Sequence, residues 1–463
     1  MERSAGASYP GIIFKNKYTA GIIVVLASAF MSYMGAMHTL LAIGLMGAGA
    51  LALAMKQPRL AIVGIIFMLE NMVFLIVPQT GFKTRLYVDA ALIIIFAMGA
   101  NWMIGKLKNE GREDMDGGVF SKYVLAMFAL VAMAAVNSMR IYSQPIELGL
   151  RASRAFLIFA SYFPLREIMR EEKARKWAKG AIMYGGFVLC IMYFAQYFLM
   201  DRVQILGIEY IERFGQTRLR IEIGLIVMSF FISLSQMAQS REHSFKFLSM
   251  AVLEIAMLTV MIKTRTVLLG LVISAGVFWF LQKRYSRLWI IYFAAMILFV
   301  NGIYMQESIA SSMYKLTVDE ISSKAGNYDV RLDEMKFYMN QALENPVIGR
   351  GVLNELHPQS NSAIGTRHKF YLSDIGVFAF FFYFGGVGII WVALFLFSMA
   401  RISIRAVRES GSYMLLLLTL YIVITMPTIF VFESPNMTFY TILAICMSEG
   451  ILENKRDVKI GQA

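Results

Sequence analysis

The residues of this chain best suited to chemistry are arginines, one of them next to a histidine, in an otherwise apolar sequence. They occupy a few polar segments: Arg151, Arg218 and Arg220, Arg265, Arg331 and Arg350, and Arg367 beside His368. Arginine is always charged, and its planar fork matches the oxygens of a phosphate group. Several such residues predict a site for an anionic ligand. A neutral imidazole beside them could accept a proton from an attacking hydroxyl group.

The elements that position these residues must be membrane helices. Of all residues, 58% are hydrophobic and only 16% are charged. So few charges could not cover a soluble domain of this size. Backbone groups in lipid must be satisfied within their own segment, which predicts an all-α integral membrane protein. The net charge of +13 is explained by basic loops facing anionic lipid, and we expect no nucleic-acid partner.

No pattern in the sequence is typical of a metal or nucleotide site. Cys190 and Cys446 both lie in apolar runs and are expected to be buried small hydrophobic residues. No spacing of cysteines, histidines or carboxylates matches a metal centre, and no phosphate-binding glycine loop is present. We therefore expect neither a metal nor a cofactor.

The apolar runs predict one polytopic transmembrane domain over residues 1–463. About fourteen of them are long enough to cross a bilayer: 18–35, 37–55, 60–77, 86–105, 122–139, 147–165, 180–200, 219–239, 246–262, 266–282, 288–304, 371–399, 412–431 and 437–452. The run 371–399 is longer than a span, so it is expected to tilt or to begin as a helix outside the membrane.

Basic residues predict the orientation of this bundle. Lysines and arginines concentrate in alternate loops: 56–59, 106–112, 166–179, 241–246, 283–287, 401–408 and 455–459. The positive-inside rule makes that side cytoplasmic and places both termini there. The other loops, including the large polar segment 304–370, then face outward between the eleventh and twelfth spans.

The outward segment 304–370 is predicted to be a lid that contains a helix. Residues 330–344 carry apolar side chains on one face at helical spacing, with Asp329 as a plausible N-cap and Pro346 as a stop. We interpret this stretch as an amphipathic helix lying on the outer membrane face.

Two interpretations of the outward arginines stay open. A charge at the edge of hydrocarbon, as at Arg220 and Arg265, marks a functional site unless it is paired. The alternative is that the arginines pair with acids and only hold the helices together; the candidate acids are Glu222, Glu254, Asp374 and Glu433. Glu70 and Asp89 are further intramembrane acids that could pair with basic residues. His368 could likewise only cap or orient the following helix.

Four segments carry a resemblance to a known family. They are R-L-R-I-E from Arg218, K-T-R-T-V-L-L-G-L from Lys263, V-R-L-D-E through N-P-V-I-G-R-G from Val330 to Gly351, and R-H-K-F-Y-L-S-D-I-G from Arg367. In this order, spread over residues 145–400, they resemble the O-antigen ligase and polymerase superfamily of bacterial integral-membrane glycosyltransferases. Lys369 stands where that family usually has asparagine, a departure from the ligase pattern.

The resemblance implies a substrate and roles for the arginines. Donor and acceptor would be undecaprenyl-pyrophosphate-linked oligosaccharides at the outer leaflet of the bacterial cytoplasmic membrane. Arg265 and His368 would be the catalytic residues. Arg218, Arg220, Arg265 and Arg331 would hold the pyrophosphate, with Arg367, Arg350 and Arg151 as second choices, and His368 would act as base or orient the donor. The reaction would need no metal, because arginines stabilise the leaving charge.

Three functions follow as expectations. The first is a polymerase that joins repeat units into a surface polysaccharide, for which the family implies a chain-length regulator as a further partner. The second is a ligase that moves the glycan to lipid A core or protein. From another class, a transporter or flippase of lipid-linked sugar would place its polar groups at mid-membrane. A purely structural or regulatory membrane protein would leave the outward arginines unexplained.

Overall fold

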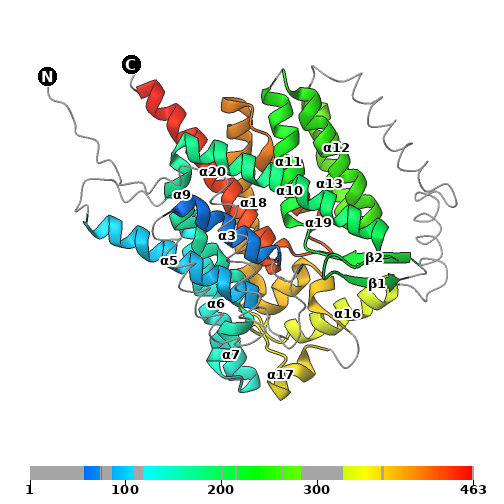
Figure 1. The fold of residues 1–463 in the computed structure, drawn as a ribbon. Helices are drawn as coiled ribbons and strands as arrows, with labels where there is room; N and C mark the ends of the chain where they lie inside the picture. The colour runs from blue at the N-terminus through cyan, green and yellow to red at the C-terminus, as the bar shows by residue number, and fades with distance from the viewer. Residues whose placement is uncertain are drawn as a thin grey trace, which may run out of the picture.

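The computed structural model describes residues 57–72, 75, 86–108, 118–200, 202–213, 216–240, 242–262, 264–282, 327–365 and 370–460. In this part the chain is a bundle of helices with one small hairpin at its margin (Figure 1). The predicted spans 18–35, 37–55 and 288–304 lie outside the described residues.

The longer helices follow the predicted apolar runs. They are α3 (Pro58–Leu69), α5 (Leu86–Lys108), α6 (Ser121–Tyr142), α10 (Glu172–Leu199), α11 (Gly224–Gln239), α12 (Ser244–Met261), α13 (Arg265–Leu281), α18 (Val377–Ser410), α19 (Met414–Thr425) and α20 (Pro435–Ile460). Among the described residues, five helices are long and apolar enough to cross a membrane, and four apolar helices are shorter. The prediction of a helical, membrane-embedded protein is confirmed in this form, and the count of about fourteen spans stays a prediction.

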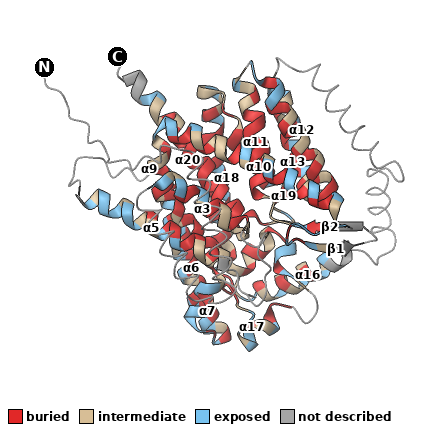
Figure 2. Cartoon of the chain, viewed as in Figure 1, coloured by how far each residue is buried: buried red, intermediate tan, exposed pale blue. Residues whose placement is uncertain are grey.

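The core is built around α20. Residues 436–450 of this helix are all buried, and α9, α11 and α18 pack against it (Figure 2). Aromatic rings from neighbouring elements fill the adjoining space: Trp391 stacks on Phe395 at 4.9 Å between ring centroids, and Phe432 meets Phe395 edge-on at 5.4 Å. The Phe432 contact holds the short turn η4 (Val431–Glu433) against the middle of α18.

The prediction of one continuous span over 147–165 is wrong. This stretch forms α7 (Ile146–Ala152), α8 (Arg154–Leu157), the 3₁₀ turn η1 (Ile158–Ser161) and α9 (Tyr162–Arg170). The hydroxyl of Ser153 donates to the carbonyl of Gly149 at 2.9 Å, a bond that competes with the helical backbone pattern and bends a helix. The apolar side chains of the run are real core residues, since Phe156 and Phe159 are buried, but they belong to short helical pieces.

The helix α18 is broken at Gly385, where an outer loop enters it. Gly385 has φ 62° and ψ −157°, a conformation that only glycine adopts readily. The loop 345–351 runs beside the break and forms four backbone hydrogen bonds with it. They are Arg350 N to Phe382 O, Gly351 N to Tyr383 O, Gly386 N to Pro346 O and Val387 N to Val347 O, at 2.7–3.1 Å. The loop therefore satisfies backbone groups that a broken membrane helix would leave open.

The outer segment contains the predicted helix, but its apolar face packs against protein. The helix α16 extends over Asn327–Ala342, and α17 over Pro358–Ala363. Tyr338 and Ala342 are buried in a second small core with residues of α18, where the rings of Tyr338 and Phe382 lie 5.6 Å apart. The expectation that this face lies on the membrane is thus corrected. Aromatic residues of α18 offer the helix a protein surface that covers the same side chains.

A β-hairpin precedes α11 and was not predicted. Strands β1 (Glu209–Arg213) and β2 (Gln216–Arg220) pair antiparallel, with Glu209 opposite Arg220. The predicted span from residue 219 accordingly starts at Gly224. Neither strand alternates polar and apolar residues over its five positions, so the sequence carried no period-2 signal for this hairpin.

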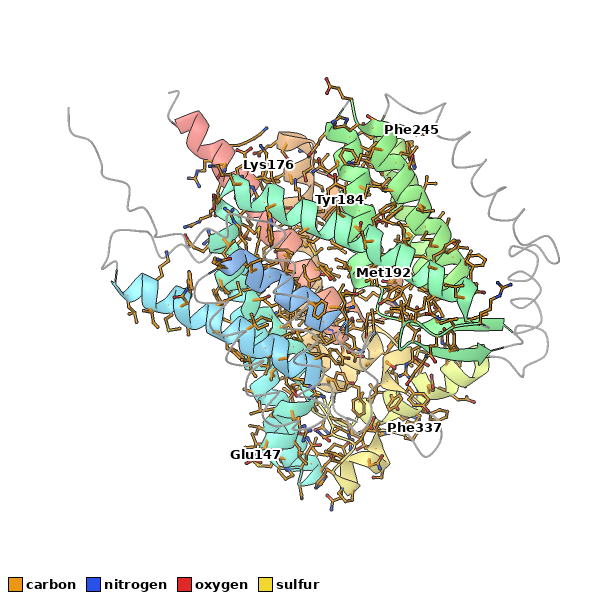
Figure 3. All side chains as sticks on the ribbon, in the orientation of Figure 1. Glu147, Lys176, Tyr184, Met192, Phe245 and Phe337 are labelled. Carbon is orange, nitrogen blue, oxygen red and sulfur yellow. The ribbon has the colours of Figure 1, made fainter. Side chains whose placement is uncertain are left out.

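The two ends of the bundle separate the predicted inward and outward residues. Lys176 and Phe245, from loops predicted to be cytoplasmic, lie at one end (Figure 3). Glu147, at the predicted outward end of a span, and Phe337, from an outward segment, lie at the other. The arrangement agrees with the alternation of loops along the sequence. We use "outer end" below for the end that carries α7, α16, α17 and the hairpin.

Candidate functional site

Several helices begin together at the outer end. The hydroxyl of Thr428, which follows α19, donates to the hydroxyl of Thr266 in the first turn of α13 at 3.1 Å. The backbone N–H of Val377, the first residue of α18, donates to the carbonyl of Met426 at 2.9 Å. The starts of α13 and α18 therefore flank the same short segment.

The starts of α11 and α20 meet at the same end. A Cβ at Gly224 would lie 2.9 Å from Nδ2 of Asn436, so α20 approaches α11 too closely for a side chain there. Four helix N-termini thus gather at the outer end, those of α11, α13, α18 and α20. Each carries partial positive charge, which favours anions.

The helix α16 is tied to the start of α18 through Glu334. Its Oε1 accepts from the backbone N–H of Tyr371 at 3.2 Å, just before the short turn η3 (Leu372–Asp374). Burial raises the pKa of Glu334, against the lowering effect of the Tyr371 bond, while nearby Asp374 raises it and Arg331 lowers it. Arg331 lies one turn before Glu334 and is exposed, and although its charge acts on Glu334 it forms no direct ion pair in the described part of the chain. This arginine is therefore available at the outer end.

The hairpin presents a weakly held arginine at the same end. Arg220 contacts Glu209 across the strands at 3.1 Å, with side chains 71% and 67% exposed. An ion pair this exposed contributes little, so an anion could replace Glu209. Arg218 lies two residues earlier in β2, on the same face of the strand. Its side chain is outside the described residues.

Arg350 has a structural environment. It is 8% exposed and donates to the Tyr142 hydroxyl, to the Gln341 carbonyl at 3.0 Å and to Glu344. Burial alone would lower the pKa of Arg350, but the bonds to Glu344 and Tyr142 raise it. Arg350 thus fixes the loop 345–351 to α6 and α16.

Polar side chains of α6 and the residues after it complete this anchoring. Nδ2 of Asn137 donates to the carbonyls of Ile348 and Gly349 at 3.2 and 2.9 Å. Gln144 donates to the Val352 carbonyl at 3.1 Å and accepts from the Asn354 backbone at 2.8 Å. The loop that enters the broken helix is therefore rigidly held.

Arg151 lies apart from the other arginines. It is exposed near the end of α7, which lies on the opposite side of the outer end from the hairpin (Figure 1). Its neighbour Arg154 is engaged by Asp89 at 3.0 and 3.2 Å. The structure thus brings Arg151 close to neither α16 nor β2.

Four predicted site residues, Arg218 among them, have side chains outside the described part of the chain. Arg367 and His368 lie outside the described residues, and Arg265 is described only in its backbone, as the first residue of α13. The residues that flank 366–369 are held, because Phe370 N donates to Gly365 O at 3.1 Å and Phe370 O accepts from the Tyr338 hydroxyl at 3.1 Å. Both ends of that segment are therefore fixed against α16.

Two of the buried acids do not pair with arginines in the described part of the chain. Glu70 accepts from the backbone N–H of Leu225 at 2.9 Å and from Asn436 at 3.3 Å. Glu254 instead contacts the Ser229 hydroxyl. Glu70 and Glu254 therefore do not support the interpretation that the arginines only pair with acids to hold the helices together. Asn436 was missed in the sequence, where a polar residue just after Ser434–Pro435 inside an apolar stretch was the only signal.

Comparisons with known proteins leave the family open. No family model matches the chain, and no curated protein matches it. The described residues contain no group of three histidines, cysteines or carboxylates that could hold a metal ion. The candidate site is thus defined by its own chemistry: exposed arginines and helix N-termini at the outer end of a membrane bundle.

Proposed function

We propose that this protein is a membrane glycosyltransferase that joins undecaprenyl-pyrophosphate-linked repeat units into a surface polysaccharide at the outer leaflet. The observation that carries the proposal is the convergence described above. Short contacts link the start of α13 to the segment after α19, that segment to the start of α18, and the residues before α18 to α16. The elements that carry Arg265 and Arg331 are thus connected through α18, and the segment with His368 is tied to α16. Exposed arginines beside helix N-termini fit a lipid pyrophosphate.

The proposed reaction is a displacement at the anomeric carbon of the donor. The acceptor hydroxyl oxygen forms a bond to that carbon, and the bond between the carbon and the pyrophosphate oxygen breaks. The electron pair leaves with the lipid pyrophosphate, and the hydroxyl proton passes to a base. Charge develops on the pyrophosphate, where Arg218, Arg220, Arg265 and Arg331 would stabilise it. In this scheme His368 orients the donor or acts as the base.

Purified protein in lipid nanodiscs, supplied with lipid-linked oligosaccharide, tests the proposal. We expect Arg265→Ala and Arg331→Ala to lower kcat/KM about 100-fold each, the typical loss when one preplaced donor is removed. Arg140→Ala is the matched control, since Arg140 is exposed near the end of α6 and outside the cluster. Full turnover by Arg265→Ala and by His368→Ala would refute the assignment, and turnover that stops on chelation of divalent metals would refute its metal-free chemistry.

A ligase and a flippase are the alternative functions. The ligase differs from a polymerase in its acceptor, and the flippase in the side of the membrane on which lipid-linked units accumulate when it is lost. A ligase would transfer glycan to lipid A core or protein and would not lengthen lipid-linked chains in this assay. A flippase would carry lipid-linked units across without forming a glycosidic bond. In a deletion strain, loss of a polymerase leaves single repeat units on the cell surface, whereas loss of a flippase leaves them on the cytoplasmic side.

A further inference from the structure

A pair of carboxylates lies beneath the arginine hairpin. Glu70 follows the last residue of α3, and Glu222 lies between β2 and α11. One amide bridges them, because Nδ2 of Asn436 is 3.3 Å from Oε1 of Glu70 and 3.1 Å from Oε2 of Glu222. The orientation of this amide is fixed, since its oxygen accepts from the backbone N–H of Met437 at 2.7 Å and from the Ser434 hydroxyl. The amide therefore presents hydrogens to both acids.

The inner acid of the pair, Glu70, is not fully hydrogen-bonded. Glu70 is 1% exposed, and its Oε2 has no hydrogen-bond partner among the described residues. The fully buried hydroxyl of Tyr440 lies beside Glu70 without meeting hydrogen-bond geometry and is likewise unsatisfied in the described part of the chain. The Glu70 carboxyl and this hydroxyl are close enough to interact, so a proton can lie between them.

The position of the pair connects it to the proposed pyrophosphate site. Glu222 is two residues after Arg220 and two before Gly224, the first residue of α11. It is half-buried, whereas Glu70 behind it is fully buried. Glu222 therefore lies between the exposed Arg220 and the interior, a position suited to a group that acts on an acceptor beside the pyrophosphate.

We propose that Glu222 is the base that accepts the proton of the acceptor hydroxyl, and that Glu70 and Asn436 position it. This inference rests on the proposed function. There His368 was either the base or the residue that orients the donor; with Glu222 as the base, His368 orients the donor. The hydroxyl oxygen bonds to the anomeric carbon while its proton moves to a carboxylate oxygen of Glu222. The lipid pyrophosphate leaves as the anion. A second carboxylate close by favours proton uptake, because two adjacent negative charges repel.

The test separates donor binding from turnover in the full chain in nanodiscs. Glu222→Gln keeps an oxygen for the Asn436 bond but removes the base. We expect its kcat to fall at least about 100-fold, a typical contribution of general base catalysis, with donor affinity within about 2-fold of wild type. Glu70→Gln, a positioning change, should lower kcat about 10-fold at unchanged KM. Glu147→Gln, an exposed acid of α7 at the same end, is the control for loss of charge.

Chemical rescue distinguishes a catalytic role from a structural one. Sodium formate supplies a free carboxylate and should restore part of the turnover of Glu222→Ala without changing that of Glu70→Gln. Wild-type kcat in Glu222→Gln would overturn the inference while leaving the proposed function intact. Loss of donor binding in Glu222→Gln would also overturn it, because the residue would then hold the donor. If the wild type forms no glycosidic bond, the proposed function itself fails.

Discussion

Replacing Gly385 by alanine gives the sharpest test of how the outer loop is held. A Cβ on this residue would lie 2.5 Å from the N of Gly349 and from the carbonyl of Val347, both backbone atoms that cannot rotate away. The φ of 62° and ψ of −157° add strain of about 1–3 kcal/mol for any residue with a side chain. The clash must also separate the four backbone hydrogen bonds at the break, each worth about 1 kcal/mol net.

The expected loss of stability for Gly385→Ala is on the order of 5 kcal/mol, combining strain and lost bonds. Two glycines provide matched controls. Gly411→Ala adds only positive-φ strain, because nothing lies within 4 Å of its Cβ position at φ 67°. Gly276→Ala adds neither strain nor a clash, since nothing lies within 4 Å there in the middle of α13, and it should stabilise by about 0.5–1 kcal/mol.

Thermal unfolding in detergent with a thiol-reactive dye measures this series. Cys190 and Cys446 are free and buried, so they react only when the bundle opens. We expect midpoints in the order Gly385→Ala, Gly411→Ala, wild type, Gly276→Ala, from lowest to highest. A midpoint of Gly385→Ala at or above that of Gly411→Ala would refute the account of the broken helix, because the two differ by the backbone clash.

Three further predictions concern the same outer region. Asn137→Ala removes two bonds to loop carbonyls and should cost about 1–3 kcal/mol, measured by the same dye assay against Asn137→Asp, which keeps the shape but loses the donor. Arg350→Ala should destabilise by about 2 kcal/mol while donor affinity stays within twofold; a large loss of affinity at unchanged stability would contradict its structural role. Burial raises the pKa of Glu334 in the folded state, so its contribution to stability is present at low pH and lost as pH rises through the folded pKa. Glu334→Gln should therefore melt above wild type at pH 8 and level with it at pH 4, and a higher midpoint at both pH values would contradict this sign.

The sequence predicted the membrane bundle because its signal is local. Lipid imposes a length and an apolar composition on each span, and both can be read within about 20 residues. Most apolar runs in the described part of the chain became helices near their predicted bounds, such as α6, α12 and α13. The run 147–165 did not, because Ser153 and its bond to Gly149 bend the chain within an apolar context. The hydrophobicity of this run predicts that its side chains are buried, but it does not predict where the helix bends.

The candidate site was predictable only in part. Residue type alone identified the arginines, since charge is rare in such a chain. Their environments needed the fold: Arg350 is enclosed by Tyr142 and Glu344, whereas Arg331 is exposed and forms no direct ion pair in the described part of the chain. No local pattern separates these two arginines, because the difference lies in contacts between α6, α16 and the loop 345–351.

By itself, the sequence determined that the chain forms apolar helices with basic loops on one side and a polar segment on the other, because these properties depend on composition over short stretches. Tertiary structure decided how the polar segment is used. It showed that α16 packs on α18 and not on lipid, that the loop after it enters a broken helix, and that Asn436 joins two acids 152 positions apart in the sequence, at residues 70 and 222. Such contacts depend on which helix ends meet, and only the assembled bundle fixes that.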